Sequence, residues 1–314
     1  MEYRYLGNTG IKVSRICFGA LTVGPLQAGL SPAAGGQVLA YALEKGINFV
    51  DTAQLYGTYA HIREGMKMAG IRPVITSKSY CYTRSMAKEA LEQALDELQV
   101  DWVDIFMLHE QESELTLAGH DEALCYLAEA KAAGRIRALG MSTHAIRGVR
   151  GGIAHPDIEI IHPLINIKGL GIMDGTREEM LAAIHSAYEC GKGLYGMKAL
   201  GGGNLINQAY EAFSWAFNQN ELASVAVGMQ TEQEVDLNLA WAEGRREPAL
   251  ESKLGQRKRR LHIEEWCQGC GQCVESCSQQ ALYLEDKIAH VWADKCLLCG
   301  YCAAACPQFG IRIF

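Results

Sequence analysis

The sequence has no long hydrophobic run and no excess of positive charge, and each absence argues against a class of protein. None of its apolar runs approaches the roughly eighteen residues of a membrane-spanning helix. The start, Met-Glu-Tyr-Arg-Tyr, lacks the basic and apolar stretches of a secretory signal. The formal net charge of -7 argues against nucleic acid as the main partner. We therefore expect a cytoplasmic protein that binds neither membranes nor nucleic acid.

The length and the order of segments indicate one large domain and one small one. The chain has 314 residues, and a (β/α)8 barrel uses roughly 250. Over residues 1–244, a hairpin in residues 1–15 precedes eight strand-like runs that alternate with helical segments. This alternation predicts an α/β fold, a TIM barrel whose active face is the rim at the carboxyl ends of its parallel strands.

Residues 245–261 separate the two parts of the chain. They are charged, contain Pro248 and follow the last predicted helix, so they are interpreted as a linker. The basic run at residues 257–260 is interpreted as a solvated part of this linker, with a docking patch as the alternative. The cysteine-rich residues 262–314 form the second part.

Polar side chains follow three successive predicted strands. Asp51 and Tyr56 come after a buried run, and Lys78 and His109 end the next two runs. Because the carboxyl ends of parallel strands meet at one rim, we expect these four side chains to converge. Each has an ordinary structural explanation as a cap, a half-buried ring, a solvated lysine or a core histidine. Their order and register favour a catalytic site instead.

This pattern resembles the aldo-keto reductase superfamily, which carries Asp, Tyr, Lys and His at the ends of three successive barrel strands. The string Asp-Thr-Ala-Gln-Leu-Tyr-Gly at residues 51–57 is its most specific part, and residues 7–14 also look like that family. The resemblance covers roughly residues 1–244. It implies that the protein reduces an aldehyde or ketone, or oxidises the corresponding alcohol, with a nicotinamide cofactor as hydride carrier.

The resemblance also implies a role for each of the four residues. Tyr56 would donate the proton, and the Lys78 cation would lower the pKa of Tyr56. Asp51 would pair with Lys78 and keep it charged. His109 would bind and orient the substrate carbonyl.

The cofactor side matches the family less closely. In the family a Ser-Asn pair and a Gln hold the nicotinamide carboxamide, whereas this chain has Ser142, Thr143 and His162 at those positions. Where many members stack a tyrosine on the nicotinamide, this chain has Met197, followed by Lys198. These five residues are the expected contacts to the nicotinamide.

The family pattern for the 2′-phosphate of NADP(H) is also absent. Where the family has a Lys and an Arg, Gly228 and Glu234 align, so NAD(H) is expected in preference to NADP(H). The backbone of residues 201–204 and of Gly228 could approach a pyrophosphate. The alternative for the glycine run is an ordinary flexible loop.

Eight of the twelve cysteines lie in the last fifth of the chain, in a repeated motif. The spacing C-x-x-C-x-x-C-x-x-x-C starts at Cys267 and recurs at Cys296, a displacement of 29 positions. The repeat resembles bacterial two-cluster ferredoxins over about residues 262–314. It implies a small α+β ferredoxin-like domain with two [4Fe-4S] clusters.

In such ferredoxins the fourth cysteine of each motif binds the other cluster. The resemblance therefore implies one ligand set of Cys267, Cys270, Cys273 and Cys306, and a second of Cys296, Cys299, Cys302 and Cys277. Two structural zinc ions are the alternative, although zinc frameworks usually offer cysteine pairs with a longer spacer. The remaining cysteines are interpreted as small buried hydrophobic residues: Cys17, Cys81, Cys125 and Cys190.

Two other functions remain open. Clusters transfer single electrons, so the barrel could be an electron-transfer platform that binds nucleotide or flavin, although the sequence has no G-x-G-x-x-G string. A binding or regulatory protein with a vestigial site is the third option. Partners expected beside the carbonyl or alcohol substrate include an electron-carrier protein.

Overall fold

The structure, a computed structural model, describes residues 1–25, 27–255, 260–277, 280–293, 295–296 and 301–313. Eight parallel strands form a closed barrel in the order β10-β3-β4-β5-β6-β7-β8-β9. The TIM barrel expected from the sequence is therefore confirmed. Its strands are β3 (Ile16–Gly19), β4 (Phe49–Asp51), β5 (Val74–Ser79), β6 (Val103–Leu108), β7 (Ile136–Thr143), β8 (Ile160–Pro163), β9 (Gly193–Gly196) and β10 (Ser224–Gly228).

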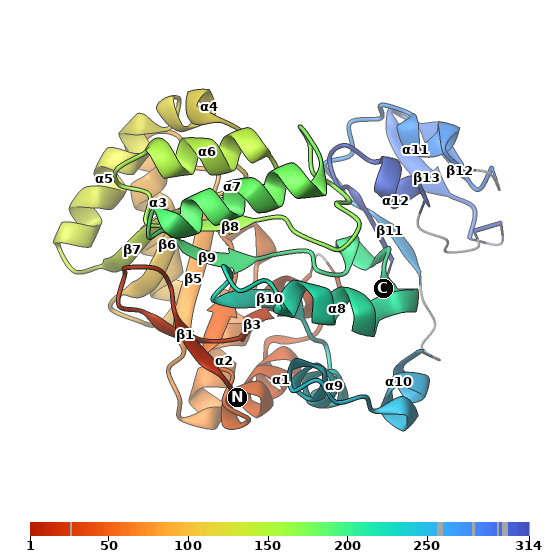
Figure 1. Ribbon diagram of the computed structural model, residues 1–314, viewed down its shortest axis with the longest axis horizontal. Coiled ribbons are helices and arrows are strands. Elements are labelled where there is room, and N and C mark those ends of the chain that lie inside the picture. Colours follow the sequence, from red (N-terminus) through yellow and green to blue (C-terminus); the bar gives the residue numbers. More distant parts are fainter. Residues whose placement is uncertain (26, 256–259, 278–279, 294, 297–300, 314) are drawn as a thin grey trace.

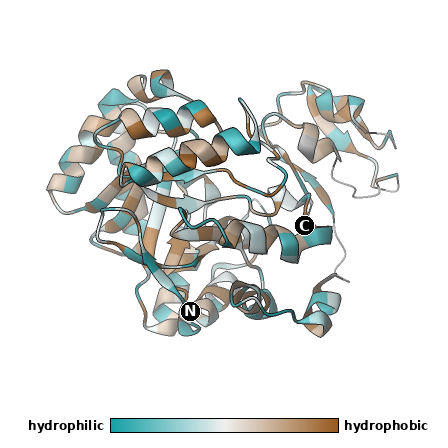
Figure 2. Cartoon of the chain, in the orientation of Figure 1, coloured by the Kyte–Doolittle hydropathy of each residue, from teal (hydrophilic) through white to brown (hydrophobic). Residues whose placement is uncertain are grey.

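Helices surround the barrel (Figure 1). The longer ones bury one side against the strands, and Figure 2 shows both hydrophobic and hydrophilic residues along them. The helices are α1 (Pro32–Glu44), α2 (Tyr59–Ala69), α3 (Arg84–Leu98), α4 (Glu114–Ala118), α5 (Asp121–Ala132), α6 (Ile146–Ala154), α7 (Arg177–Glu189), α8 (Ala209–Phe217) and α9 (Glu232–Ala242), with the short η1 (Ala20–Val23), η2 (Gln54–Tyr56), η3 (Gly201–Gly203) and η4 (Ile206–Gln208).

From the sequence, the segment before the β8 run is interpreted as a short glycine-broken connection, because glycine lowers helix propensity, yet the structure forms helix α6 there. The structure shows why glycine is needed there. A Cβ atom on Gly148 would lie 2.1 Å from Thr143 Oγ1, and one on Gly151 would lie 2.8 Å from the Glu114 backbone nitrogen. Close packing against β7 and α4 thus outweighs the weak local preference for a helix.

The hairpin expected in residues 1–15 is present as β1 (Tyr3–Tyr5) and β2 (Lys12–Ser14), which pair antiparallel. Leu6 and Ile11 beside it are fully buried and pack with the inward-facing side chains of the barrel, including Phe49 and Ile105. The hairpin therefore closes the end of the barrel opposite the carboxyl ends of the strands, and the interior is packed rather than open.

The C-terminal part is a small α+β unit beside the barrel (Figure 1). It contains two antiparallel strand pairs, β11 with β14 and β12 with β13. Its elements are β11 (Leu261–Ile263), α11 (Gln272–Glu275), β12 (Leu282–Glu285), β13 (Ile288–Val291), α12 (Tyr301–Ala305) and β14 (Ile311–Ile313).

The segment interpreted as a linker contains a helix, α10 (Pro248–Gly255). The Trp241 indole N–H donates to Glu251 at 3.0 Å, and Arg246 pairs with the same carboxylate at 2.6 Å. These contacts fix the start of α10 against α9, so this part of the segment is not an irregular connection. Residues 256–259, which include most of the basic run, lie outside the described residues.

The four scattered cysteines divide into two pairs. Cys17 and Cys81 are buried, as expected. Cys125 and Cys190 are exposed, so the expectation of burial was wrong for them. Cys125 lies on the outer side of α5, whose buried positions are Ala123, Leu124, Leu127 and Ala130, and Cys190 is the C-cap residue of α7.

Among the described residues, no helix has the length and apolar character needed to cross a membrane.

Candidate active site

Asp51 and Lys78 form a buried ion pair at the carboxyl end of the barrel. Asp51 ends β4, Lys78 lies near the end of β5, and these strands are neighbours. The Lys78 ammonium donates to both carboxylate oxygens of Asp51, at 2.7 and 2.8 Å, and to the Thr52 carbonyl at 2.8 Å. Both side chains are almost fully buried. The pair therefore holds a fixed position, and its two charges largely cancel.

Tyr56 and His109 lie beside this pair. Tyr56 ends η2, which follows β4, and His109 directly follows β6. The Lys78 ammonium is 5.2 Å from the centre of the Tyr56 ring. The ring centres of Tyr56 and His109 are 5.7 Å apart. The structure thus brings together the four residues that the sequence pattern singled out.

Tyr56 is held in its protonated form. Burial raises the pKa of its hydroxyl, and the carboxylates of Asp51 and Glu110 raise it further, whereas Arg312 lowers it. The resemblance implied a pKa lowered by Lys78, whereas the pKa of Tyr56 is raised overall, because burial and the two carboxylates outweigh the nearby cations. Tyr56 therefore keeps its proton at neutral pH, as a proton donor must.

The histidines around the pair are neutral. Burial lowers the pKa of His109 and His144 well below the usual value, and lowers that of His162 to about 4. His162 Nδ1 donates to the Tyr195 carbonyl at 2.6 Å, so the 3.8 Å approach of its Nε2 to Asp51 is not an ion pair. A neutral His109 can donate a hydrogen bond to a carbonyl without bringing a charge into the site.

Sequence reasoning missed two aromatic side chains that support the site. The Tyr195 hydroxyl, from β9, donates to Asp51 Oδ1 at 2.7 Å. The Tyr80 ring stacks on His109 with ring centres 4.4 Å apart, and its hydroxyl donates to Glu110 at 2.6 Å. Tyr80 directly follows β5, and Glu110 follows His109 after β6; these positions at the strand ends were the available signal. Nothing in the sequence distinguishes Tyr195 from a core residue.

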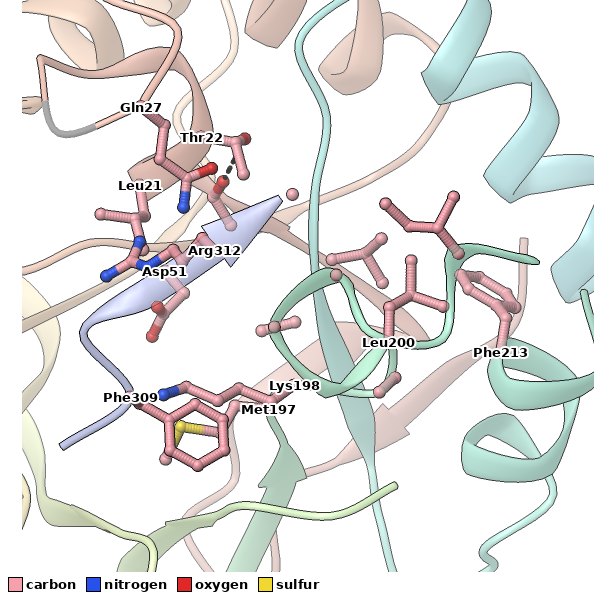
Figure 3. Close-up of a pocket in the computed structure, with 18 of the residues that line it drawn as sticks. Leu21, Thr22, Gln27, Asp51, Met197, Lys198, Leu200, Phe213, Phe309 and Arg312 are labelled. Atoms are coloured by element: carbon pink, nitrogen blue, oxygen red, sulfur yellow. Dashed lines mark hydrogen bonds between the residues drawn. The ribbon is translucent and has the colours of Figure 1, made fainter. Parts of the chain in front are cut away.

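The four residues Asp51, Tyr56, Lys78 and His109 line one cavity of about 1170 Å³. Ligand pockets usually measure about 300 to 1,000 Å³, so this one has room for a dinucleotide together with a small substrate. Figure 3 shows part of its wall, with Asp51 and Lys198 from the barrel and Phe309 and Arg312 from the C-terminal part. The cavity therefore lies between the barrel rim and the C-terminal unit.

Six of the seven residues expected to hold the cofactor line this cavity: Ser142, His162, Met197, Lys198, Gly228 and Glu234. Thr143 does not belong to the described wall. Its hydroxyl accepts from the Ala145 amide at 3.0 Å and donates to the Ala145 carbonyl at 3.1 Å. Its side chain therefore closes the turn before α6 rather than facing a ligand.

Four cysteines line a second, smaller cavity in the C-terminal unit: Cys267, Cys270, Cys273 and Cys306. Three come from the first motif and one from the second, as the expected ligand set requires. Burial raises the pKa of the Cys273 thiol, and the other three sulfurs raise it further. Iron bound to the sulfurs would relieve this repulsion. These residues fit a cluster.

Backbone amides point at several of these sulfurs. The Ala289 amide donates to Cys267 at 3.4 Å and the Gly310 amide to Cys306 at 3.3 Å. Such N–H groups stabilise sulfur ligands and tune cluster potentials. In the second set, the Cys277 sulfur accepts from the Ala281 amide at 3.3 Å. Cys299 of that set lies outside the described residues.

Comparison with protein families gives two matches. The model of the aldo/keto reductase family matches residues 15–211, more than half of the chain. This chain belongs to the aldo/keto reductase family. The model of the 4Fe-4S dicluster domain matches residues 266–311. The chain therefore joins a barrel of this family to a ferredoxin-type dicluster domain, called the dicluster module below.

Relatives of this aldo/keto reductase have several activities. This chain is 29% identical over 159 residues to 6-dehydroglucose reductase of Novosphingobium aromaticivorans, and the match covers 45% of this chain and 51% of that protein. It is 26% identical over 212 residues to L-galactose dehydrogenase of Arabidopsis thaliana, covering 56% of this chain and 65% of that protein. The chain thus spans about half to two thirds of the length of these curated relatives.

A solved structure of an aldo-keto reductase from Bacillus halodurans matches with a TM-score of 0.66 at 20% identity. The match covers 82% of this chain and 96% of that one. At this level of identity the likeness shows the fold alone.

In this aldo/keto reductase the dicluster module closes one side of the catalytic cavity. Phe309, three residues after Cys306, is buried, and the Lys198 ammonium lies 4.0 Å from its ring centre. The ring also lies 5.6 Å from that of His144. A Cβ on Gly171 would meet a ring atom of Phe309 at 1.7 Å, so only glycine fits there. Phe309 is therefore packed into the barrel rim.

The two cavities share part of their walls. Gln268 and Gln308 line both of them, and their side chains bond to each other at 3.0 Å. The first cysteine set is therefore separated from the catalytic cavity by only a thin layer of side chains. This arrangement was not predictable from the sequence, because it depends on how two independent units pack.

Proposed function

We propose that this protein reduces an aldehyde or ketone with hydride from NADH, with Tyr56 as the proton donor. The observation that supports the proposal most strongly is the buried Asp51–Lys78 pair beside the Tyr56 ring, in a cavity large enough for cofactor and substrate. NADH, when bound, supplies the hydride.

Each residue of the site has a defined role in this proposal. The Tyr56 hydroxyl transfers its proton to the carbonyl oxygen, and a neutral His109 donates a hydrogen bond that orients the same oxygen. As the proton leaves, the phenolate is stabilised by the adjacent Lys78 ammonium. Asp51 keeps Lys78 charged and aimed, and the Tyr195 hydroxyl fixes Asp51.

The residues around the cavity fit a dinucleotide. We propose that Ser142, His162 and Met197 contact the nicotinamide end, with Lys198 next to it. Glu234 accepts from the Gln230 amide at 2.6 Å at the start of α9, at the adenosine end. The side chain that would bind a 2′-phosphate has no room at position 228, because a Cβ on Gly228 would lie 2.0 Å from Thr22 Cγ2.

We expect NADH to bind at least about tenfold more tightly than NADPH. The Glu234 carboxylate repels a 2′-phosphate and can accept from a ribose hydroxyl. Titration of anaerobically purified protein with each nucleotide gives the two Kd values, and oxidation of each with an aldehyde panel gives the turnover. A tenfold tighter Kd for NADPH would overturn this preference.

A matched pair of variants assigns the preference to one side chain. Glu234→Gln should bring the Kd values for NADH and NADPH closer together. Glu232→Gln, in the same turn of α9 and outside the cavity wall, should leave it unchanged. If both variants behave alike, the preference arises elsewhere.

The shared wall between the two cavities favours a second role, in which the clusters exchange electrons with the catalytic site or with a separate electron-carrier protein. We propose this role beside carbonyl reduction, and a cytoplasmic location, since cluster thiolates persist in reducing compartments. Gln268 and Gln308 line both cavities, which supports a short route between them.

Reduced clusters should be oxidised when an accepted carbonyl compound is added to dithionite-reduced protein with bound nucleotide. Cluster absorbance is followed anaerobically, with and without nucleotide, and then with candidate protein carriers. Clusters that stay reduced in both cases, and that no carrier oxidises faster than a free dye does, would show a structural role only. The spectrum of the purified protein also tests for flavin, which the electron-transfer alternative requires.

A further inference from the structure

Arg312 extends from the dicluster module into the catalytic cavity. It lies in β14, the last strand, and its Nη2 pairs with Glu264 at 2.8 Å. Its guanidinium is 5.7 Å from the Trp266 ring. The other terminal nitrogen, Nη1, is buried and has no hydrogen-bond partner among the described residues. One half of this planar donor group is therefore left for a ligand.

Lys198 supplies a second positive charge to the same cavity. It follows β9 in the left-handed region, with φ of 59°, a strained conformation that is typical of functional sites. Within the described part of the chain its ammonium makes no hydrogen bond and no ion pair, and it lies over the Phe309 ring. Burial lowers the pKa of Lys198 to about 8, and the charges of Glu110 and Glu264 offset only part of this effect.

The other main charges of the cavity already have partners. Asp51 is paired with Lys78, Arg246 with Glu251, and Glu110 accepts from the Tyr80 hydroxyl. A buried charge without a partner is costly, and such a group is usually matched by a ligand. Arg312 and Lys198 are therefore cations of the described cavity wall that keep donor groups for a ligand.

We propose that Arg312, assisted by Lys198, binds a carboxylate of the substrate, so that the protein reduces aldehydes or ketones that carry a carboxylate. The inference rests on the proposed function for the reaction itself. A guanidinium presents parallel N–H groups that match a carboxylate, and desolvation strengthens this contact. Arg312 is thus a specificity residue supplied by the dicluster module.

The pyrophosphate of the dinucleotide is the other anion that the cavity could hold. The position of Arg312 favours the substrate. Its charge lowers the pKa of Tyr56, and Phe309 of the same segment packs against Lys198 and His144 rather than against Glu234 and Gly228.

The test compares carboxylates with their methyl esters, using holoenzyme that contains its clusters. Glyoxylate, 4-oxobutanoate and 4-carboxybenzaldehyde provide three spacings between carbonyl and carboxylate. For at least one pair, the wild type should favour the acid by about tenfold or more in kcat/KM. Arg312→Gln should lose this preference while it keeps ester turnover, and Lys198→Met should lose part of it. Arg246→Gln, which removes a cation of the cavity wall that is paired with Glu251, should leave the preference for acids unchanged.

Three further measurements decide between the explanations. Arg312→Lys keeps the charge next to Glu264 and should still lose most of the preference for acids over esters. This variant serves as the test if Arg312→Gln does not retain its clusters. Calorimetry with terephthalate, which has two carboxylates but no aldehyde or ketone group to reduce, should show binding that depends on Arg312. If no carbonyl compound is reduced but this binding is present, the proposed function fails and the carboxylate site stands.

Esters and acids reduced equally well, with terephthalate binding independent of Arg312, would overturn the carboxylate site and leave the proposed function intact. Weaker binding of NADH to Arg312→Gln, with the preference for acids retained, would assign the guanidinium to the pyrophosphate. This result would also overturn the carboxylate site.

Discussion

Tyr56→Phe is expected to lower kcat for carbonyl reduction by about a hundredfold or more, with little change in the Kd for NADH. The substitution removes one hydroxyl and keeps the ring that packs beside Lys78 and His109. Burial holds this hydroxyl in its protonated form, so its removal takes away the proton that the proposed reaction transfers. Steady-state kinetics on an accepted aldehyde, together with nucleotide titration, measures both quantities.

Tyr82→Phe is the matched control. Tyr82 lies on the same rim but is exposed, and its ring contacts His120 rather than the catalytic residues. This variant should keep wild-type kcat. If Tyr56→Phe retains more than about a tenth of the wild-type kcat, Tyr56 is not the proton donor. If the wild type itself turns over no carbonyl compound, a binding or regulatory protein with a vestigial site becomes the better account.

Cys306→Ser is expected to remove the cluster formed by the first motif, although Cys306 belongs to the second. The reason is geometric, since Cys306 lines one cavity with Cys267, Cys270 and Cys273. Cys277→Ser should damage the other cluster. Iron and sulfide should fall from about eight of each per chain to about four in each variant, as measured by chemical analysis and electron paramagnetic resonance.

Cys125→Ser controls for the loss of a thiol, because Cys125 is exposed on α5 of the barrel. It should keep all the iron. Two zinc ions per chain in place of iron would contradict the cluster assignment. The module buries few apolar side chains, so we also expect loss of either cluster to lower its resistance to proteolysis more than that of the barrel.

The barrel was predictable because its signals are local. Strand-like runs and helices alternate, and Asp51, Lys78 and His109 stand at the ends of neighbouring strands, where the fold itself brings them together. Helix α6 was missed because its glycines serve packing rather than helix formation. The expected lowering of the Tyr56 pKa by Lys78 left out the burial of the hydroxyl and the charge of Asp51, which both raise that pKa.

The remaining parts of the site depend on contacts between distant segments. Phe309 and Arg312 reach the cavity only because the dicluster module packs on the barrel rim, and no periodicity or motif records that packing. Thr143 aligned with a cofactor contact, yet its hydroxyl is used within its own turn. Sequence alignment identifies the position of such a residue but not the direction of its side chain.

The most direct test of the central claim follows one hydride. Anaerobic protein is mixed with NADH that carries deuterium at the transferable position and with an accepted aldehyde, and the alcohol product is examined by mass spectrometry. We predict one deuterium on the carbinol carbon in the wild type, and product formation that depends on Tyr56. An alcohol without deuterium, formed while the clusters are oxidised, would contradict the account and assign the reduction to single electrons from the dicluster module.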